Sequence, residues 1–131
     1  SDLDSKYVDF NDYTSNFLET KGFSSEIISL LKLVSEKVDS AFGDLELETK
    51  YFPSFMKKEL GGKFFLVVKP QKKAIIVELQ PDTFEFDEGE LEKFVSAFGN
   101  GKSKNAHGKP EFKCTTAPMI EEIVKFMKDS Y

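Results

Sequence analysis

The fold of this protein is decided by residues 63–79, which read Lys-Phe-Phe-Leu-Val-Val-Lys-Pro-Gln-Lys-Lys-Ala-Ile-Ile-Val-Glu-Leu. The run predicts two apolar strands, Phe64–Val68 and Ala74–Leu79, that fold back on each other across a polar turn at Lys69–Lys73. Valine and isoleucine favour a pleated strand, and an unbroken apolar run is typical of the centre of a sheet. A buried helix is the alternative, but Pro70 interrupts the run before a helix reaches normal length. We therefore expect a central hairpin.

The segments before this hairpin predict one helix and two more strands. From Ser24, a candidate N-cap, apolar residues recur every three or four positions until Gly43, where a left-handed cap would end the helix. Apolar and charged residues alternate from Leu45, which predicts a half-buried strand that ends or bulges at Pro53. A further strand is expected within Ser54–Leu60, followed by a Gly-Gly turn into the hairpin.

The segments after the hairpin predict two helices separated by a short strand. Asp87 is a candidate cap for the first helix, which Gly99 would end. Gly99–Pro110 contains no large apolar residue and is expected to be an exposed loop, followed by a strand at Glu111–Thr115. The last helix would be capped by Thr115 or Thr116 and run to the C-terminus. The fold class is therefore α+β: an antiparallel β-meander of three to five strands packed against about three helices, in the order α-β-β-β-β-α-β-α.

Length and composition indicate one globular domain without a metal or cofactor. The 131 residues, 40% hydrophobic and 31% charged, suit a domain at 23–131 preceded by a tail or linker at 1–22 that is partly docked on it. The single cysteine, Cys114, excludes an internal disulfide and suits a reducing compartment, so we expect a cytoplasmic protein. One histidine and one cysteine argue against structural zinc. No apolar run approaches the roughly 20 residues that cross a membrane, so no membrane contact is expected.

The charges are unevenly distributed along the chain. Residues 50–73 hold seven lysines and one acid (net +6), although the whole chain carries −5 and contains no arginine, the residue that best reads guanine. Lysines with nearby aromatics are consistent with a surface for a nucleic-acid backbone, and lysines also protect strand edges from aggregation. The candidate binding surface comprises Lys57, Lys58, Lys63, Lys69, Gln71, Lys72, Lys73, Lys102, Lys104 and His107.

Patterns typical of catalytic sites are weak. Gly101-Lys102-Ser103 matches the end of a Walker A motif, but the preceding glycine and the strand-loop-helix context are missing, so we reject a nucleotide cradle. The loop glycines with Lys102, Lys104 and Lys109 could wrap an anion, or form a solvated loop. His107 has no nucleophile or acid nearby in sequence, and Cys114 is expected to be a buried, inert thiol. A helix start explains the acids Glu85, Asp87, Glu88, Glu90 and Glu92.

Three stretches carry a resemblance to a known family. The first is Tyr51–Leu79 with its Pro70-Gln71-Lys72-Lys73 turn, and the others are Phe98-Gly99-Asn100-Gly101 and Ile123–Tyr131. Together they resemble an uncharacterised bacterial and archaeal domain family labelled "predicted transport protein". The resemblance implies a domain that stands alone or accompanies nuclease-like or restriction-associated domains, with no established catalytic residues. The chain departs from the family in having Phe98 for Trp, Lys102 for an acid and a longer loop to Pro110.

These observations support two functional hypotheses. The first is a non-catalytic interaction or accessory module, part of a nuclease or defence-associated protein, with acidic helices that meet a basic protein partner. The alternative is a module that binds a nucleic-acid backbone through the lysine-rich turns of the meander. A cleft that gathered His107, a carboxylate and Lys102 would instead indicate an enzyme.

Overall fold

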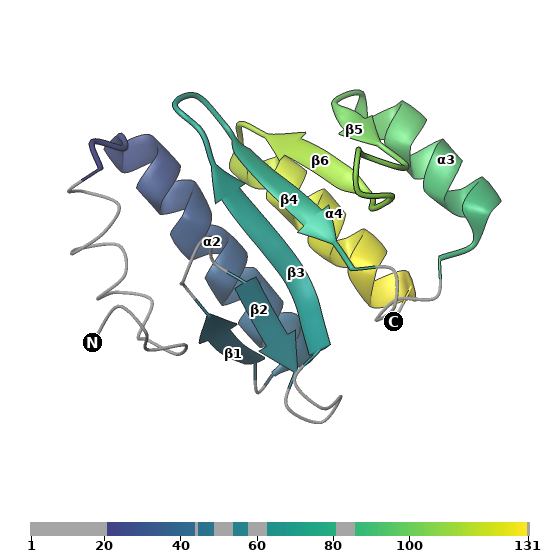
Figure 1. The fold of residues 1–131 in the computed structure, drawn as a ribbon, viewed down its shortest axis with the longest axis horizontal. Coiled ribbons are helices and arrows are strands. Elements are labelled where there is room, and N and C mark those ends of the chain that lie inside the picture. Colours follow the sequence, from purple (N-terminus) through teal and green to yellow (C-terminus); the bar gives the residue numbers. More distant parts are fainter. Residues whose placement is uncertain (1–20, 44, 49–53, 58–62, 81–85, 131) are drawn as a thin grey trace.

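The computed structural model describes residues 21–43, 45–48, 54–57, 63–80 and 86–130 (Figure 1). Three helices and six strands lie within them: α2 (Ser25–Phe42), β1 (Leu45–Glu48), β2 (Ser54–Lys57), β3 (Lys63–Pro70), β4 (Ile75–Leu79), α3 (Glu88–Phe98), β5 (Gly101–Lys102), β6 (Glu111–Cys114) and α4 (Ala117–Ser130). The expected α+β class is confirmed. The two-residue strand β5 is an addition to the predicted order, so the sheet has more strands than the three to five expected.

The six strands form one antiparallel sheet in the order β1-β2-β3-β4-β6-β5. Strand β4 lies between β3 and β6, and all five of its residues are buried, which confirms the hairpin as the centre of the sheet. The turn is shorter than predicted, because Lys69 and Pro70 pair with Ile76 and Ile75 inside the sheet. Proline is tolerated at the end of a strand, where its missing N–H removes little pairing.

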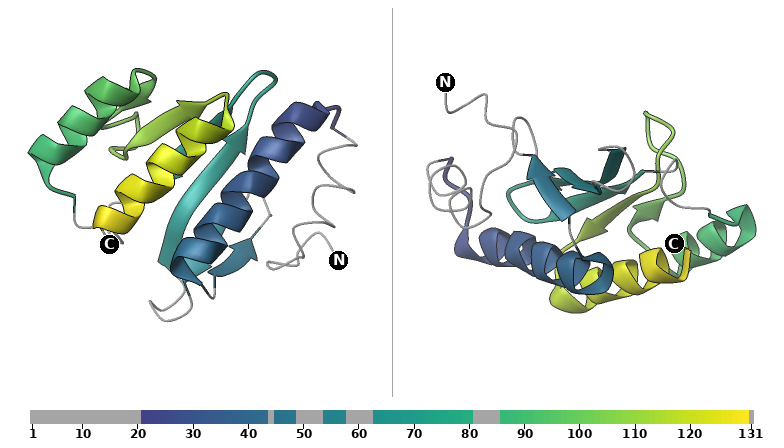
Figure 2. Two further views of the ribbon diagram at one scale, coloured as in Figure 1. Left: turned by 180° about the vertical axis from the view of Figure 1, so that it is seen from behind. Right: turned by 90° about the horizontal axis from the view of Figure 1, so that it is seen from below.

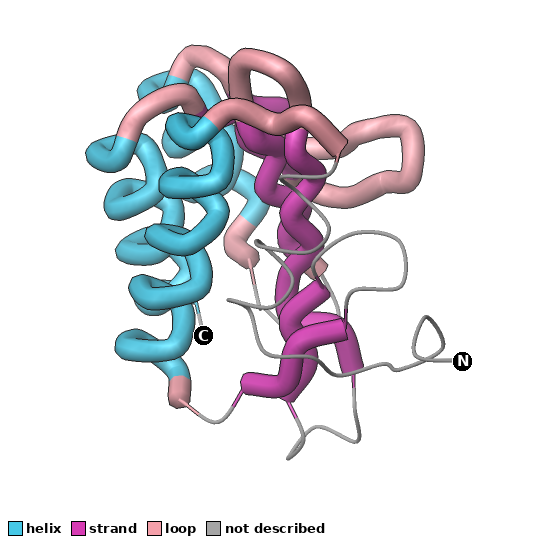
Figure 3. Tube along the Cα trace, turned by 90° about the vertical axis from the view of Figure 1, so that its left-hand side faces the viewer, coloured by secondary structure: helices cyan, strands magenta, loops and turns pink. Residues whose placement is uncertain are grey.

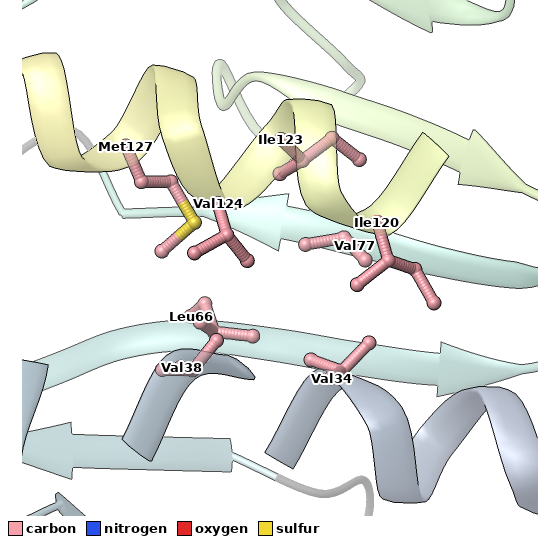
Figure 4. A pocket seen from close by; sticks show the side chains of 8 residues that line it. All are labelled: Val34, Val38, Leu66, Val77, Ile120, Ile123, Val124 and Met127. Carbon is pink, nitrogen blue, oxygen red and sulfur yellow. The ribbon is translucent and has the colours of Figure 1, made fainter. Parts of the chain in front are cut away.

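All three helices cover the same face of the sheet (Figures 2 and 3). Alternate residues of β4 point to this face, namely Ile75, Val77 and Leu79, and join the core formed with α2 and α4. A gap of about 10 Å³ remains between α2 and α4, and its lining is entirely apolar (Figure 4). Such a gap holds at most one water and has no polar group to bind one. The helix side of the sheet is therefore a packed core.

The opposite face of the sheet carries Ile76 and Glu78, and no described helix covers it. Residues 103–110 rise on this side (Figure 2, right) and attach to β4 where Leu79 N–H donates to the Pro110 carbonyl at 2.9 Å. The expectation of an exposed loop at Gly99–Pro110 is therefore wrong in part. Gly101 and Lys102 form β5, and Pro110 is buried. Polar residues of this loop contact a buried carboxylate on β4 as well as the solvent.

Helix boundaries follow the predicted caps, except that Gly43 ends α2 with φ 64° and ψ 160° and not in the predicted left-handed helical conformation. The Ser24 hydroxyl accepts a hydrogen bond from Ile27 N–H, and the Asp87 carboxylate accepts one from Glu90 N–H. Gly99 ends α3 in the left-handed conformation, with φ 85°. Helix α4 begins at Ala117, immediately after the predicted cap residues. The predicted tail at residues 1–22 lies almost entirely outside the described residues, as do positions 58–60 of the expected strand Ser54–Leu60.

Candidate functional site

Among the described residues, the predicted binding set includes two exposed groups that lie toward different ends of the sheet. Gln71, Lys72 and Lys73 are exposed in the β3–β4 turn, at the end of the sheet where Ile75 pairs with Cys114. The exposed residues Lys102, Lys104 and His107 belong to β5 and the loop after it, toward the other end of β4. Four residues of β4 span roughly 13 Å, so the two groups are separate. Lys58 lies outside the described residues, and Lys57 and Lys63 are cross-strand neighbours in β2 and β3.

Lys69 is part of a polar network on the helix-free face of the sheet. Its ammonium donates to Glu78 Oε2 at 3.1 Å, Asn105 Nδ2 donates to the same oxygen at 2.7 Å, and Lys109 Nζ lies 3.9 Å from Oε1. Only 6% of the Glu78 side chain is exposed, so these groups compensate a buried charge. Glu78 and Asn105 were not among the predicted site residues. A lone carboxylate inside an apolar strand is the sequence signal that marks Glu78.

Asn105 connects the loop to the sheet. Its side-chain oxygen accepts hydrogen bonds from the N–H groups of His107 (2.8 Å) and Lys109 (3.1 Å), while its side-chain nitrogen binds Glu78. One amide therefore shapes the turn and anchors it at the same time. His107 contributes its backbone to this turn and leaves its side chain exposed. The loop is accordingly a folded cap over Glu78, and its lysines 102 and 104 face the solvent.

The buried Glu78 carboxylate should make the stability of the fold depend on pH. Burial raises the pKa of its carboxyl, but hydrogen bonds from Lys69 and Asn105 and the charges of Lys69 and Lys109 outweigh burial, so the pKa lies below 4.5. A lowered folded-state pKa means that ionised Glu78 stabilises the fold above the unfolded-state pKa, and that this stability is lost as the pH falls through the folded-state pKa. Another acidic residue, Glu111 on β6, is paired directly opposite Glu78 in the sheet.

We expect the substitution Glu78→Gln to remove this dependence. The difference in free energy of unfolding between wild type and variant should shrink from about pH 6 to about pH 3, because protonation removes the wild type's advantage. Urea unfolding at a series of pH values measures it. A Glu111→Gln control reports on the neighbouring acid. A wild-type advantage that stays constant over this range contradicts the assignment.

The Phe98-Gly99-Asn100-Gly101 segment has a structural role. Phe98 meets the Phe112 ring edge to face at 5.2 Å, Gly99 caps α3, and the Asn100 carbonyl accepts from Lys113 N–H at 3.0 Å. A Cβ at Gly101 would lie 2.7 Å from Cδ1 of Phe112, its cross-strand partner, so only glycine fits. These contacts explain the motif through packing and hydrogen bonding.

Four half-buried phenylalanines form a continuous series where α3 meets α4. Phe86 stacks on Phe126 at 5.5 Å, Phe126 stacks on Phe94 at 4.3 Å, and Phe94 contacts Phe98 at 5.9 Å. We call Phe86, Phe94, Phe98 and Phe126 the aromatic row. Each ring packs on the core and keeps an accessible part. None of the four rings was among the predicted binding residues, although an aromatic beside the buried stripe of a helix, as Phe126 is, is a detectable signal.

An open recess lies between the first turns of α2 and α4. Its volume is about 370 Å³, and its lining is Ser25, Glu26, Ser29, Leu30, Thr115, Thr116 and Ala117. Hydroxyls and the positive ends of two helices favour an anion there, whereas the Glu26 carboxylate opposes one. Cys114 pairs with Ile75, which follows the Lys72–Lys73 turn, and Cys114 directly precedes Thr115 of the recess in the chain. The turn and the recess therefore lie at the same end of the sheet (Figure 1).

Cys114 is a core residue, as predicted. The side chain is fully buried, and burial raises the pKa of the thiol to about 12. The thiolate is the reactive form, so a thiol with this pKa is inert at neutral pH.

We expect Cys114 to react with Ellman's reagent only when the protein unfolds. The native protein should remain unlabelled while protein in guanidinium reacts fully, because the reagent cannot reach the thiol. A Cys114→Ala, Lys113→Cys variant supplies an exposed thiol in the same strand and should react at once. Equal rates for the wild type and this variant would contradict the burial.

Comparisons with known proteins add no relative. The chain matches no protein-family model, no curated protein and no solved structure. Within the described ranges, no group of three or more histidine, cysteine, aspartate or glutamate side chains could hold a metal ion. No described helix is long and apolar enough to cross a bilayer.

Proposed function

We propose that this chain is a non-catalytic interaction module that binds a protein partner through the aromatic row. The observation that carries this proposal is the series of four half-buried rings in mutual contact at the junction of α3 and α4. Aromatic side chains are enriched at protein interfaces because rigid rings bury a large apolar area at little entropic cost.

The geometry of the row supports binding as well as folding. Phe112 beneath it is completely buried and already completes the core, with its ring 5.3 Å from Phe94 and 5.2 Å from Phe98. The row adds a second aromatic layer above Phe112 that remains partly in contact with water. Neighbouring aromatic rings that keep an accessible part offer a partner apolar side chains of the type enriched at protein interfaces.

The test is a partner-binding comparison between two matched variants. Phe126→Ala removes the ring that joins Phe86 to Phe94, and Leu33→Ala removes a half-buried apolar side chain of α2 outside the row. Wild type and Leu33→Ala are expected to retain a partner in affinity capture from the source cells, confirmed by purified binding, whereas Phe126→Ala loses at least about tenfold in affinity. Equal binding by both variants would refute the proposal. Thermal unfolding shows that both remain folded.

The finer part of the proposal is that this partner is a nuclease or another defence-associated protein. The resemblance in the Phe98–Gly101 and Tyr51–Leu79 segments supports it, because that family accompanies nuclease-like or restriction-associated domains. Identification of the captured protein tests this part separately. A partner without any role in nucleic-acid cleavage or defence contradicts it and leaves the interaction role in place.

A second candidate function is binding of a nucleic-acid backbone by the β3–β4 turn. The observation that favours it is the exposed pair Lys72 and Lys73, at the same end of the sheet as the recess between the first turns of α2 and α4. Lys72→Glu with Lys73→Glu should weaken binding to DNA or RNA and reduce its salt dependence. Lys102→Glu with Lys104→Glu is the matched control, with the same change of charge on the β5 side. Binding that is absent, or weakened equally by both, excludes this role for the turn.

A further inference from the structure

We propose that the partner segment bound by the aromatic row is basic and apolar: a peptide that packs one or two apolar side chains against the rings and surrounds them with lysine or arginine. This inference rests on the proposed interaction function and specifies the chemistry of the partner. It is drawn from the charges around the row, as distinct from the rings themselves.

Carboxylates flank the row on the α4 side. Glu122 lies one helical turn before Phe126 and Asp129 lies three residues after it, so both are neighbours of this ring on the helix surface. Both residues are exposed. The two lysines of this segment, Lys125 and Lys128, lie one residue before and two residues after Phe126, so they project about 100° and about 160° away from it around the helix.

The α3 side repeats this arrangement. Glu90 lies one turn before Phe94 and is exposed, whereas Lys93 precedes Phe94 directly and projects away from it. The stacked rings are thus bordered by acids from two helices, and the nearest lysines on these helices point elsewhere.

Such a border selects its partner by charge. Arginine and lysine would meet carboxylates at the rim, an arrangement that charge complementarity favours. A nucleic-acid backbone or an acidic segment would be repelled by the same carboxylates.

The experiment uses two amphipathic helical peptides, each of about five turns. The first carries leucine and phenylalanine on one face and lysine and arginine on the other, and the second has glutamate in place of every basic residue. At physiological salt the basic peptide should bind at least about tenfold more tightly, and NMR shift changes should centre on residues 86–98 and 122–129.

Charge-reversal variants separate this surface from general acidity. Glu122→Lys with Asp129→Lys should weaken the basic peptide about tenfold. Glu36→Lys with Asp39→Lys, also on exposed positions of a helix but on α2 beyond α4, changes the net charge equally and should alter affinity by less than about twofold. Equal losses for the two variants overturn the inference.

The remaining outcomes distinguish the inference from the proposed function. If the acidic peptide binds the row more tightly, the proposed preference for a basic partner is wrong, and the row remains an interaction surface. Shift changes outside the row for both peptides overturn the inference, and the Phe126→Ala partner comparison then decides the proposed function independently.

Discussion

Replacing Phe112 by alanine is expected to lower the free energy of unfolding by about 3–5 kcal/mol. The ring is fully buried, contacts Phe94 and Phe98 edge to face, and covers the backbone of Gly101. Its loss would leave a cavity between α3 and the sheet that the surrounding backbone cannot close. Urea unfolding measures the loss, and Lys113→Ala, at an exposed position of the same strand, should change stability by less than about 0.5 kcal/mol.

A double-mutant cycle with Gly101 isolates the contact. Gly101→Ala should be destabilising in the wild type, because the new Cβ would lie 2.7 Å from the Phe112 ring. In the Phe112→Ala background the obstructing ring is gone, so the same change should cost little. A cost that is equal in both backgrounds would show that the ring does not lie over Gly101.

Asn105→Asp is expected to lower the free energy of unfolding by about 3 kcal/mol at neutral pH. The new carboxylate can still accept from the His107 and Lys109 amides, so the turn itself is preserved. The donor to Glu78 is lost, and two carboxylates would face each other where nitrogen and oxygen now lie 2.7 Å apart. The variant therefore separates the loop from the sheet without removing its internal hydrogen bonds.

The pH dependence identifies this mechanism. Two carboxylates at such a distance share one proton in mild acid, so the cost should become smaller toward about pH 4. Asn100→Asp, an exposed asparagine in the preceding turn, is the matched control and should be nearly neutral in effect. Hydrogen exchange at the Leu79 amide, which binds Pro110, reports the loss of attachment directly. A pH-independent cost would contradict the pairing of residues 78 and 105.

Much of the fold could be predicted from local patterns. The ends of α2 and α3 lie at residues that favour helix ends through their conformation or hydrogen bonding, namely Ser24, Gly43, Asp87 and Gly99. Such preferences act within a few residues, so the sequence reveals them. The strand β5 could not be predicted, because two residues have no periodicity. It exists because Gly101 permits the Phe112 ring to approach and the Asn100 carbonyl binds Lys113.

The candidate sites were less predictable. Lysines stand out in composition, yet the predicted lysine surface divides between two ends of the sheet. The aromatic row combines Phe86 from the segment before α3, two rings of α3 and Phe126 of α4. No spacing in the sequence relates Phe126 to Phe94, because their stacking depends on how the two helices pack on the sheet.

The hairpin at residues 63–79 also has one feature that the sequence determined and one that only the tertiary structure decided. Its apolar residues by themselves determined a central strand, since burial on both faces favours a run in which nearly every residue is apolar, such as Ala74–Leu79. Only the tertiary structure decided what the one charged residue of that run does. Glu78 is stable inside the sheet because Lys69 from the neighbouring strand and Asn105 from 27 positions along the chain bring their donors to it. A buried charge requires partners of opposite polarity, and their identity depends on which segments the fold places around it.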